Sequence, residues 1–150
     1  MSTINKSSLC GPLGVLLLVE DSKADIRLVM EALQETETPP PICIVEDGEA
    51  AIAYLREEDP NSAHPGLVLL DLNLPKKRGL QVLAEMKSDE RLKRIPVVVL
   101  TGSRNEDDVH AAYELGANCY VAKPMDFDDF AQVIKLIVEF WLQTAILPRD

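Results

Sequence analysis

Val15-Leu-Leu-Leu-Val-Glu-Asp21 is a run of five apolar residues that ends in two carboxylates. A short run that is apolar at every position indicates a strand buried on both faces, as in a parallel sheet. Four more runs of this kind follow along the chain: Ile42-Cys-Ile-Val45, Leu67-Val-Leu-Leu70, Val97-Val-Val-Leu100 and Cys119-Tyr-Val-Ala122. The sequence therefore predicts five buried strands.

Apolar residues at helical spacing fill the segments between and after these runs. The spacing appears first at Ile26, Val29, Met30 and Leu33. It recurs in residues 50–54, 80–84, 109–113 and 127–143. Helix-ending signals agree, since prolines follow the first segment and Gly116 follows the fourth. Five strands that alternate with five helices predict a three-layer α/β fold with right-handed crossovers.

The 150 residues are enough for one domain, which we expect over residues 13–143 between flexible tails at 1–12 and 144–150. The net charge of −10 argues against a nucleic-acid partner, because such a chain repels phosphates unless it has a basic face. We interpret Lys76-Lys77-Arg78 and the basic residues between Lys87 and Arg94 as solvated surface. Too few residues follow the last helix for a DNA-binding motif, so output is expected through protein contacts.

The three cysteines, Cys10, Cys43 and Cys119, fit neither a zinc site nor a disulfide framework. Cys43 and Cys119 lie in apolar runs, where we expect buried, reduced thiols, and this indicates a cytoplasmic protein. No apolar run is long enough to span a bilayer, and the N-terminus does not have the pattern of a signal peptide. We therefore expect no membrane partner.

Polar residues follow four of the predicted strands. In an open parallel sheet, ligands bind at the carboxyl ends of the strands, where Glu20, Asp21, Asp71, Thr101 and Lys123 should meet. Three carboxylates so close together repel one another, and a bound Mg²⁺ would relieve that repulsion. Asp71 can then attack phosphorus, while Lys123 and Thr101 stabilise the transferred group.

Each of these residues alone has a simpler interpretation. Glu20 and Asp21 are favourable at a helix start, Thr101 and Ser103 can cap the next helix, and Lys123 can be a surface lysine. Five polar residues at the ends of four apolar strands are harder to explain by structure alone. We therefore favour a shared functional site.

Four stretches at these strand ends carry a resemblance to a known family. They are Leu17-Leu-Val-Glu-Asp-Ser22, Leu69-Leu-Asp-Leu-Asn-Leu-Pro75, Val98-Val-Leu-Thr-Gly102 and Tyr120-Val-Ala-Lys-Pro124. From about Val15 to Phe140, the chain resembles the receiver domains of two-component signalling. The resemblance implies a doubly wound, flavodoxin-like sheet with strand order 2-1-3-4-5. It also implies a sensor histidine kinase as partner and a signalling role rather than catalysis on external substrates.

The resemblance also implies a role for each residue of the site. Asp71 would be the phosphoacceptor, and Lys123 would contact the phosphoryl group, with a cis peptide before Pro124. The metal would be held directly by Asp21, through water by Glu20, and by the main-chain carbonyl of Asn73 together with Asp71. Thr101 and Tyr120 would form the switch pair.

Other stretches narrow the resemblance or depart from it. Four further stretches are similar in sequence to the stand-alone response regulators of cyanobacterial phytochromes. They are Asp21-Ser-Lys-Ala-Asp25, Lys93-Arg-Ile-Pro96, Gly102-Ser-Arg-Asn-Glu-Asp107 and Phe140-Trp-Leu-Gln-Thr144. The family often has Asp or Asn before the glycine after strand three, whereas Arg78 precedes Gly79 here. Residues 57–65 form an insertion.

Three alternative functions remain to be weighed. A degenerate receiver that serves only as a scaffold is disfavoured by the intact carboxylates, Thr101 and Lys123. A phosphohydrolase with an aspartyl nucleophile would need a second Asp and a Thr after Asp71, where Leu72-Asn-Leu-Pro75 stands. A flavin-binding domain of similar topology would need a phosphate loop after the first strand, where Glu20-Asp21 would repel a phosphate.

The last helix carries more apolar residues than one buried face needs. One stripe should pack on the sheet: Phe127, Phe130, Ala131, Ile134, Ile137, Val138 and Trp141. A second set, Val133, Leu136 and Phe140, lies on another face. This set is either covered by the C-terminal tail through Ile146 and Leu147 or exposed, and an exposed apolar patch indicates an interface. We expect a homodimer through this surface.

Overall fold

A computed structural model of the chain describes residues 14–57 and 64–148. Its parallel sheet has the strand order β2-β1-β3-β4-β5. The strands are β1 (Leu16–Val19), β2 (Ile42–Val45), β3 (Leu67–Leu70), β4 (Val97–Thr101) and β5 (Cys119–Ala122). The helices are α2 (Lys23–Gln34), α3 (Gly48–Leu55), α4 (Gly79–Ser88), α5 (Glu106–Glu114) and α6 (Phe127–Val138), and α6 continues into the π-helical turn η1 (Glu139–Thr144). The predicted fold class and strand order are confirmed.

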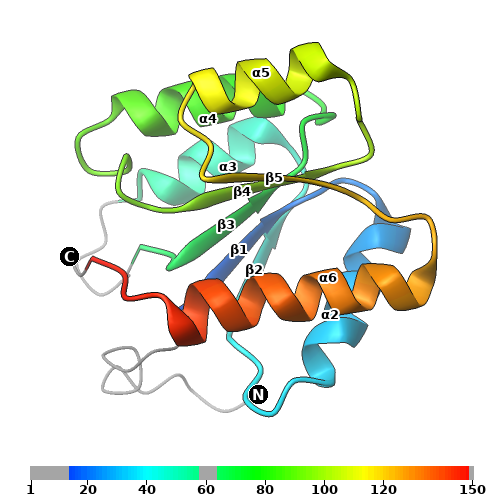
Figure 1. Cartoon of the computed structure of the whole chain (residues 1–150). Coiled ribbons are helices and arrows are strands. Elements are labelled where there is room, and N and C mark those ends of the chain that lie inside the picture. The colour runs from blue at the N-terminus through cyan, green and yellow to red at the C-terminus, as the bar shows by residue number, and fades with distance from the viewer. Residues whose placement is uncertain (1–13, 58–63, 149–150) are drawn as a thin grey trace.

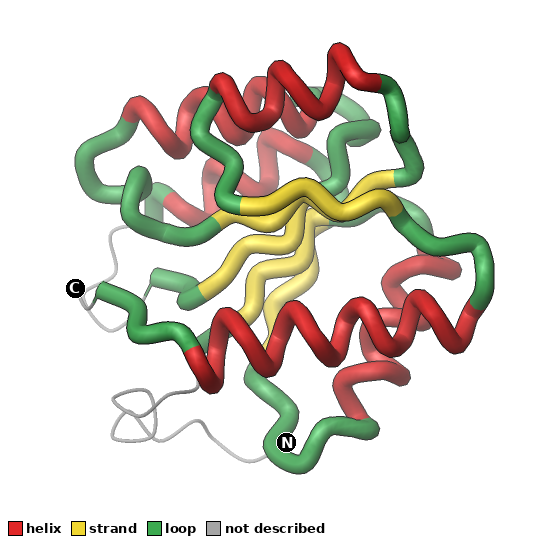
Figure 2. The backbone as a smooth tube through the Cα atoms, in the orientation of Figure 1, coloured by secondary structure: helices red, strands yellow, loops and turns green. Residues whose placement is uncertain are grey.

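The helices cover both faces of the sheet and make three layers (Figure 1). Helices α3, α4 and α5 lie on one face, while α2 and α6 lie on the other (Figure 2). Side chains alternate along each strand, so Leu17 and Val19 pack toward the first group of helices and Leu16 and Leu18 toward the second. This double burial explains why β1, β3 and β4 are apolar at every position. The edge strands β2 and β5 are half-buried, so the prediction of five buried strands holds for the three inner strands alone.

Side-chain caps fix where four helices begin. Ser22 Oγ accepts from the Asp25 backbone N–H at 3.2 Å, and Asp47 Oδ1 accepts from Ala50 N–H at 2.7 Å. Asn105 Oδ1 accepts from Asp107 N–H at 2.8 Å, and Asp126 Oδ1 accepts from two N–H groups of the first turn of α6. Each cap satisfies N–H groups that the helix itself leaves free, and holds a helix N-terminus near the carboxyl edge of the sheet.

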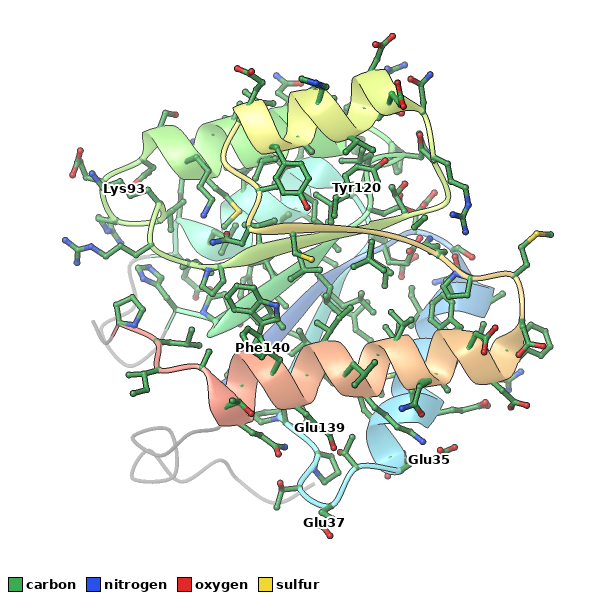
Figure 3. All side chains as sticks on the ribbon, in the orientation of Figure 1. Glu35, Glu37, Lys93, Tyr120, Glu139 and Phe140 are labelled. Atoms are coloured by element: carbon green, nitrogen blue, oxygen red, sulfur yellow. The ribbon has the colours of Figure 1, made fainter. Side chains whose placement is uncertain are left out.

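The end of the last helix departs from regular winding. In η1 the Ala145 N–H donates to Phe140 O at 2.7 Å, a bond that spans five residues instead of four. The wider turn rotates each residue by less than an α-helix does, and it leaves Leu142 fully buried against Gly14 and Gly66. Phe140 is 53% exposed and Leu136 57% exposed (Figure 3).

The two predicted apolar sets of this helix have mixed outcomes. The core stripe is confirmed from Phe130 to Trp141, but Phe127 is 71% exposed, so its assignment to the core was wrong. Phe127 is the first residue of α6, directly after the Asp126 cap, and the packing of the helix on the core begins at Phe130. Covering by the tail is contradicted for Ile146, which is 98% exposed, whereas Leu147 packs on the core.

Several other expectations concern the chain's ends and its cysteines. The tail predicted over residues 1–12, Cys10 and most of the insertion at 57–65 lie outside the described residues. Cys43 and Cys119 carry free thiols, and they are half-buried rather than fully buried. Among the described residues, no helix has the length and apolar character that crossing a bilayer requires.

Candidate functional site

The carboxyl edge of the sheet brings together charged side chains that are nearly inaccessible to water. Glu20 follows β1 and is 3% exposed, Asp71 follows β3 and is 6% exposed, and Thr101 ends β4 with no exposed surface. Lys123 follows β5 with a side chain that is 12% exposed. Ionised groups at such depth require partners, since an unpaired buried charge is very costly.

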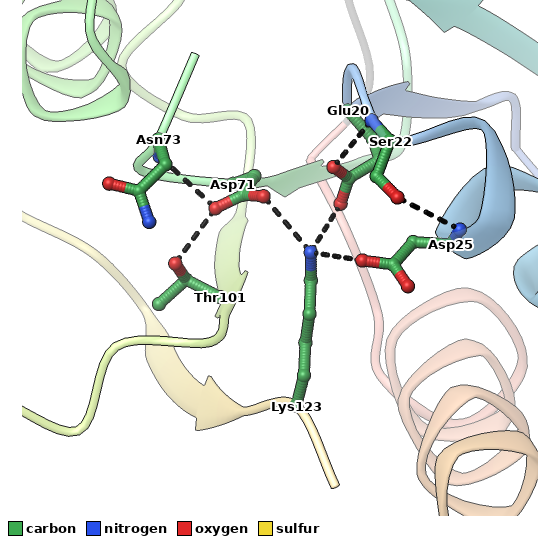
Figure 4. Close-up of polar contacts among 7 residues, drawn as sticks. All are labelled: Glu20, Ser22, Asp25, Asp71, Asn73, Thr101 and Lys123. Carbon is green, nitrogen blue, oxygen red and sulfur yellow. Dashed lines mark hydrogen bonds and ion pairs between the residues drawn. The ribbon is translucent and has the colours of Figure 1, made fainter. Parts of the chain in front are cut away.

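Asp71 lies at the centre of this group and accepts three hydrogen bonds (Figure 4). The Thr101 hydroxyl donates to Asp71 Oδ1 at 2.7 Å, and the Asn73 backbone N–H donates to the same oxygen at 3.1 Å. Lys123 Nζ donates to Oδ2 at 3.0 Å. Burial alone would raise the pKa of Asp71, but these hydrogen bonds outweigh it and hold the pKa below its usual value. Asp71 is therefore held as a carboxylate, the form that a nucleophile needs.

Lys123 joins three carboxylates through one ammonium group. Its Nζ lies 2.7 Å from Glu20 Oε1, 2.7 Å from Asp25 Oδ2 and 3.0 Å from Asp71 Oδ2. Burial opposes the charge on Lys123, yet these three hydrogen bonds raise its pKa above the usual range of a lysine. The ammonium is thus a fixed positive charge beside Asp71.

Glu20 shows that this positive charge does not balance the site completely. Burial, together with the nearby charge of Asp71, raises the pKa of Glu20 from 4.5 to about 7, despite its bonds to Lys123 and to the Ser22 N–H. Since burial and the charge of Asp71 oppose the ionisation of Glu20, a further cation would stabilise its carboxylate.

The arrangement of the carboxylates fits such a cation. Glu20, Asp21 and Asp71 each offer an oxygen, and these oxygens lie within 4.8 Å of one another. Asp21 is exposed, so the cluster opens to solvent on one side. A few carboxylate oxygens with room for waters suit Mg²⁺. The predicted carbonyl ligand from Asn73 stays a prediction; the Asn73 N–H orients Asp71.

Tyr120 occupies the strand next to Thr101. Its hydroxyl donates to the Ser103 carbonyl at 2.9 Å, and its ring packs against the core beneath α3, α4 and α5. Its backbone N–H donates to the Tyr113 hydroxyl at 3.1 Å. Tyr120 thus contacts the loop that leaves Thr101, and its switch role stays a prediction.

Two expectations about individual residues are corrected here. The predicted cis peptide before Pro124 is wrong, because the bond is trans. The trans form of an X–Pro bond is favoured by roughly 0.5–1 kcal/mol, and Lys123 reaches all its partners with it. The capping interpretation of Thr101 and Ser103 also fails, since Asn105 caps α5 and Thr101 donates to Asp71.

Asp25 is a residue of the site that was not predicted. It lies in the first turn of α2, whereas the predicted site residues follow the ends of strands. Its position four residues after Asp21, just behind the Ser22 cap, was the available signal, because a helix starting there directs its first turn along the same edge.

Known proteins share this sequence and architecture. The response regulator Rcp1 of Synechocystis sp. is 54% identical over 139 residues, which cover 91% of this chain and 95% of that protein. The crystal structure of the phosphorylated cyanobacterial phytochrome response regulator RcpA matches with a TM-score of 0.85 and 54% identity, over 91% of this chain and 99% of that one. The Mn²⁺-bound form of Rcp1 matches with a TM-score of 0.83 and 54% identity, over 90% of this chain and 99% of that one.

These similarities agree with the resemblance to receiver domains that the strand ends carry, and with the narrower resemblance to cyanobacterial phytochrome response regulators. The family model described as the response regulator receiver domain matches residues 16–135, which include every residue of the buried site. The chain belongs to the response regulator receiver domain family.

Proposed function

We propose that this protein accepts a phosphoryl group on Asp71 from a sensor histidine kinase and signals by changing conformation. The reaction requires Mg²⁺, the kinase belongs to a phytochrome system, and the protein acts in the cytoplasm without processing external substrates. The observation that carries the proposal is the fixed Asp71 carboxylate, which lies 3.0 Å from Lys123 Nζ and 2.7 Å from Thr101 Oγ1. The 54% identity to the cyanobacterial phytochrome response regulator RcpA supports the phytochrome assignment.

The proposed transfer uses each of these groups. An oxygen of Asp71 attacks phosphorus, the bond from phosphorus to the donor histidine nitrogen breaks, and the electron pair stays on that nitrogen. Lys123 and the Thr101 hydroxyl stabilise the negative charge of the transferred group. A divalent cation held by Glu20, Asp21 and Asp71, with the Asn73 carbonyl, would supply further charge neutralisation.

A second copy of the chain is the proposed binding partner for the outer face of α6. Leu136 and Phe140 are more than half exposed, whereas Val133, which was predicted with them, is half-buried and packs on the core. A contiguous apolar patch on a small protein usually marks an interface. The same patch on each copy can pair with itself, as in a twofold dimer.

Phosphorylation by a small-molecule donor tests the central proposal. Wild type incubated with Mg²⁺ and acetyl phosphate should gain the mass of one phosphoryl group, and Asp71→Asn should gain none. Asp128→Asn removes an exposed aspartate near the same edge and should be labelled as wild type is. Equal labelling of Asp71→Asn, or full labelling of wild type in EDTA, would contradict the proposal.

A further inference from the structure

We infer that Asp25 is a positioning residue, which holds the Lys123 ammonium beside Asp71 while the carboxylates of Glu20 and Asp71 bind a cation. The inference rests on the proposed Mg²⁺-dependent function and adds a residue to its site. It starts from the contacts of Lys123. The ammonium has three protons, and the three carboxylates within 3.0 Å of Nζ use all of them (Figure 4).

Asp25 differs from the other two partners of Lys123 in what else it can bind. Glu20 and Asp71 belong to the group whose oxygens come within 4.8 Å of one another, together with Asp21. Among the described residues, Asp25 is not part of that group. A cation at the cluster would therefore share two of the three carboxylates that contact Lys123 and would leave the third, Asp25, to Lys123 alone.

The backbone fixes Asp25 where this contact is made. Its N–H donates to the Ser22 side chain at 3.2 Å, and it lies in the first turn of α2, where a carboxylate is favoured by the helix dipole. The Ser22 N–H donates to Glu20 Oε2 at 3.1 Å, so the same turn orients Glu20. A flexible lysine takes its position from the carboxylates around it, and Asp25 is held on a rigid element.

The loss of Asp25 has a defined consequence for metal binding. Without this acceptor, the ammonium keeps only Glu20 and Asp71 as partners, and these are two of the three carboxylates that the cation would also bind. The loss of Mg²⁺ affinity in an Asp25 variant must depend on Lys123. A loss of affinity caused only by the removal of one negative charge would not depend on Lys123. Glu46 provides the matched comparison, because it follows β2 and pairs with Lys23 at 2.9 Å instead of with Lys123.

Calorimetric titration with Mg²⁺ tests the inference. Asp25→Ala should weaken Mg²⁺ affinity about three- to tenfold, as expected for coupled neighbours, whereas Glu46→Ala should change it much less. Asp25→Glu, which retains the carboxylate, should bind nearly as wild type does. In a Lys123→Met background, Asp25→Ala should have little further effect.

The outcomes separate the inference from the function on which it rests. Wild-type affinity in Asp25→Ala would overturn it, and so would an equal loss of affinity in the Lys123→Met background. If Asp25→Ala does not fold, Asp25→Glu is compared with Asp25→Asn. We expect weak Mg²⁺ binding in Asp25→Asn alone, and equal Mg²⁺ binding by the two variants would overturn the inference. No Mg²⁺ binding by wild type would refute the metal-dependent function itself.

Discussion

At the scale of single residues, the excess of negative charge in the site has its clearest effect on the pKa of Glu20. This carboxyl is buried against Asp71, and its pKa of about 7 lies well above the 4.5 of an unstrained glutamate. The folded protein therefore holds this proton more tightly than the unfolded chain does. The stability that the protonated carboxyl contributes is fully present below the pKa of the unfolded chain. It is lost as the pH rises through the pKa of the folded protein.

Metal-free protein should accordingly become less stable as the pH rises from about 4.5 to about 7. Urea denaturation in EDTA should give a lower free energy of unfolding above this pH window than below it. This difference should be smaller in Glu20→Gln. Glu31→Gln, on the exposed side of α2, should retain the difference. Saturating Mg²⁺ should offset it, because a cation favours the ionised carboxyl. An identical pH dependence in Glu20→Gln would show that this group is not its source.

Thr101 is expected to pass the state of Asp71 to Tyr120. Thr101→Ala should still be phosphorylated, because Asp71 and Lys123 remain, yet it lacks the hydroxyl that a phosphoryl oxygen would draw inward. Amide chemical shifts of Ser103 and Tyr120 should change on phosphorylation in wild type and in Thr101→Ser. They should change little in Thr101→Ala. A full response in Thr101→Ala would assign the coupling to other residues.

At the scale of elements, the strands were predictable because β1, β3 and β4 are buried on both faces and the half-buried edge strands β2 and β5 are equally apolar. The five apolar runs coincide with the five strands to within one residue. The site residues that directly follow a strand were found by the same reasoning. Asp25 was missed because helical periodicity does not say which polar residue of a first turn faces the sheet edge. Phe127 was misplaced for a related reason, since periodicity does not reveal at which residue the packing of a helix on the core begins.

The junction of β3 and α4 depends on a residue without a side chain. A Cβ at Gly79 would lie 2.3 Å from the Asp71 carbonyl oxygen and 2.6 Å from Leu72 Cα, so α4 would have to move away from Asp71. Gly79→Ala should cost about 1–3 kcal/mol of unfolding free energy, as overpacking does. Gly102→Ala is the matched control, because nothing lies within 4 Å of its Cβ. Comparable urea midpoints for the two variants would argue against this close packing.

At the scale of the whole molecule, the exposed face of α6 should govern self-association. Phe140→Glu places a charge in the patch formed by Leu136 of α6 and Phe140 of η1, and it should yield a monomer by light scattering, whereas wild type is expected to form a dimer. Ile146→Glu is the control, since Ile146 is 98% exposed and lies beyond η1. A folded Phe140→Glu that dimerises as wild type does would rule out this face. A monomeric wild type at high concentration, with and without phosphoryl group, would rule out the dimer.

The hydrogen bond between the Tyr120 N–H and the Tyr113 hydroxyl also affects how the sheet meets other chains. β5 is an outermost strand, and unpaired N–H groups on such a strand act as a template for strand addition and aggregation. The hydroxyl occupies one of these donors at 3.1 Å. An incoming strand must displace Tyr113 before it can pair at this position, so the tyrosine protects the β5 edge against intermolecular sheet extension.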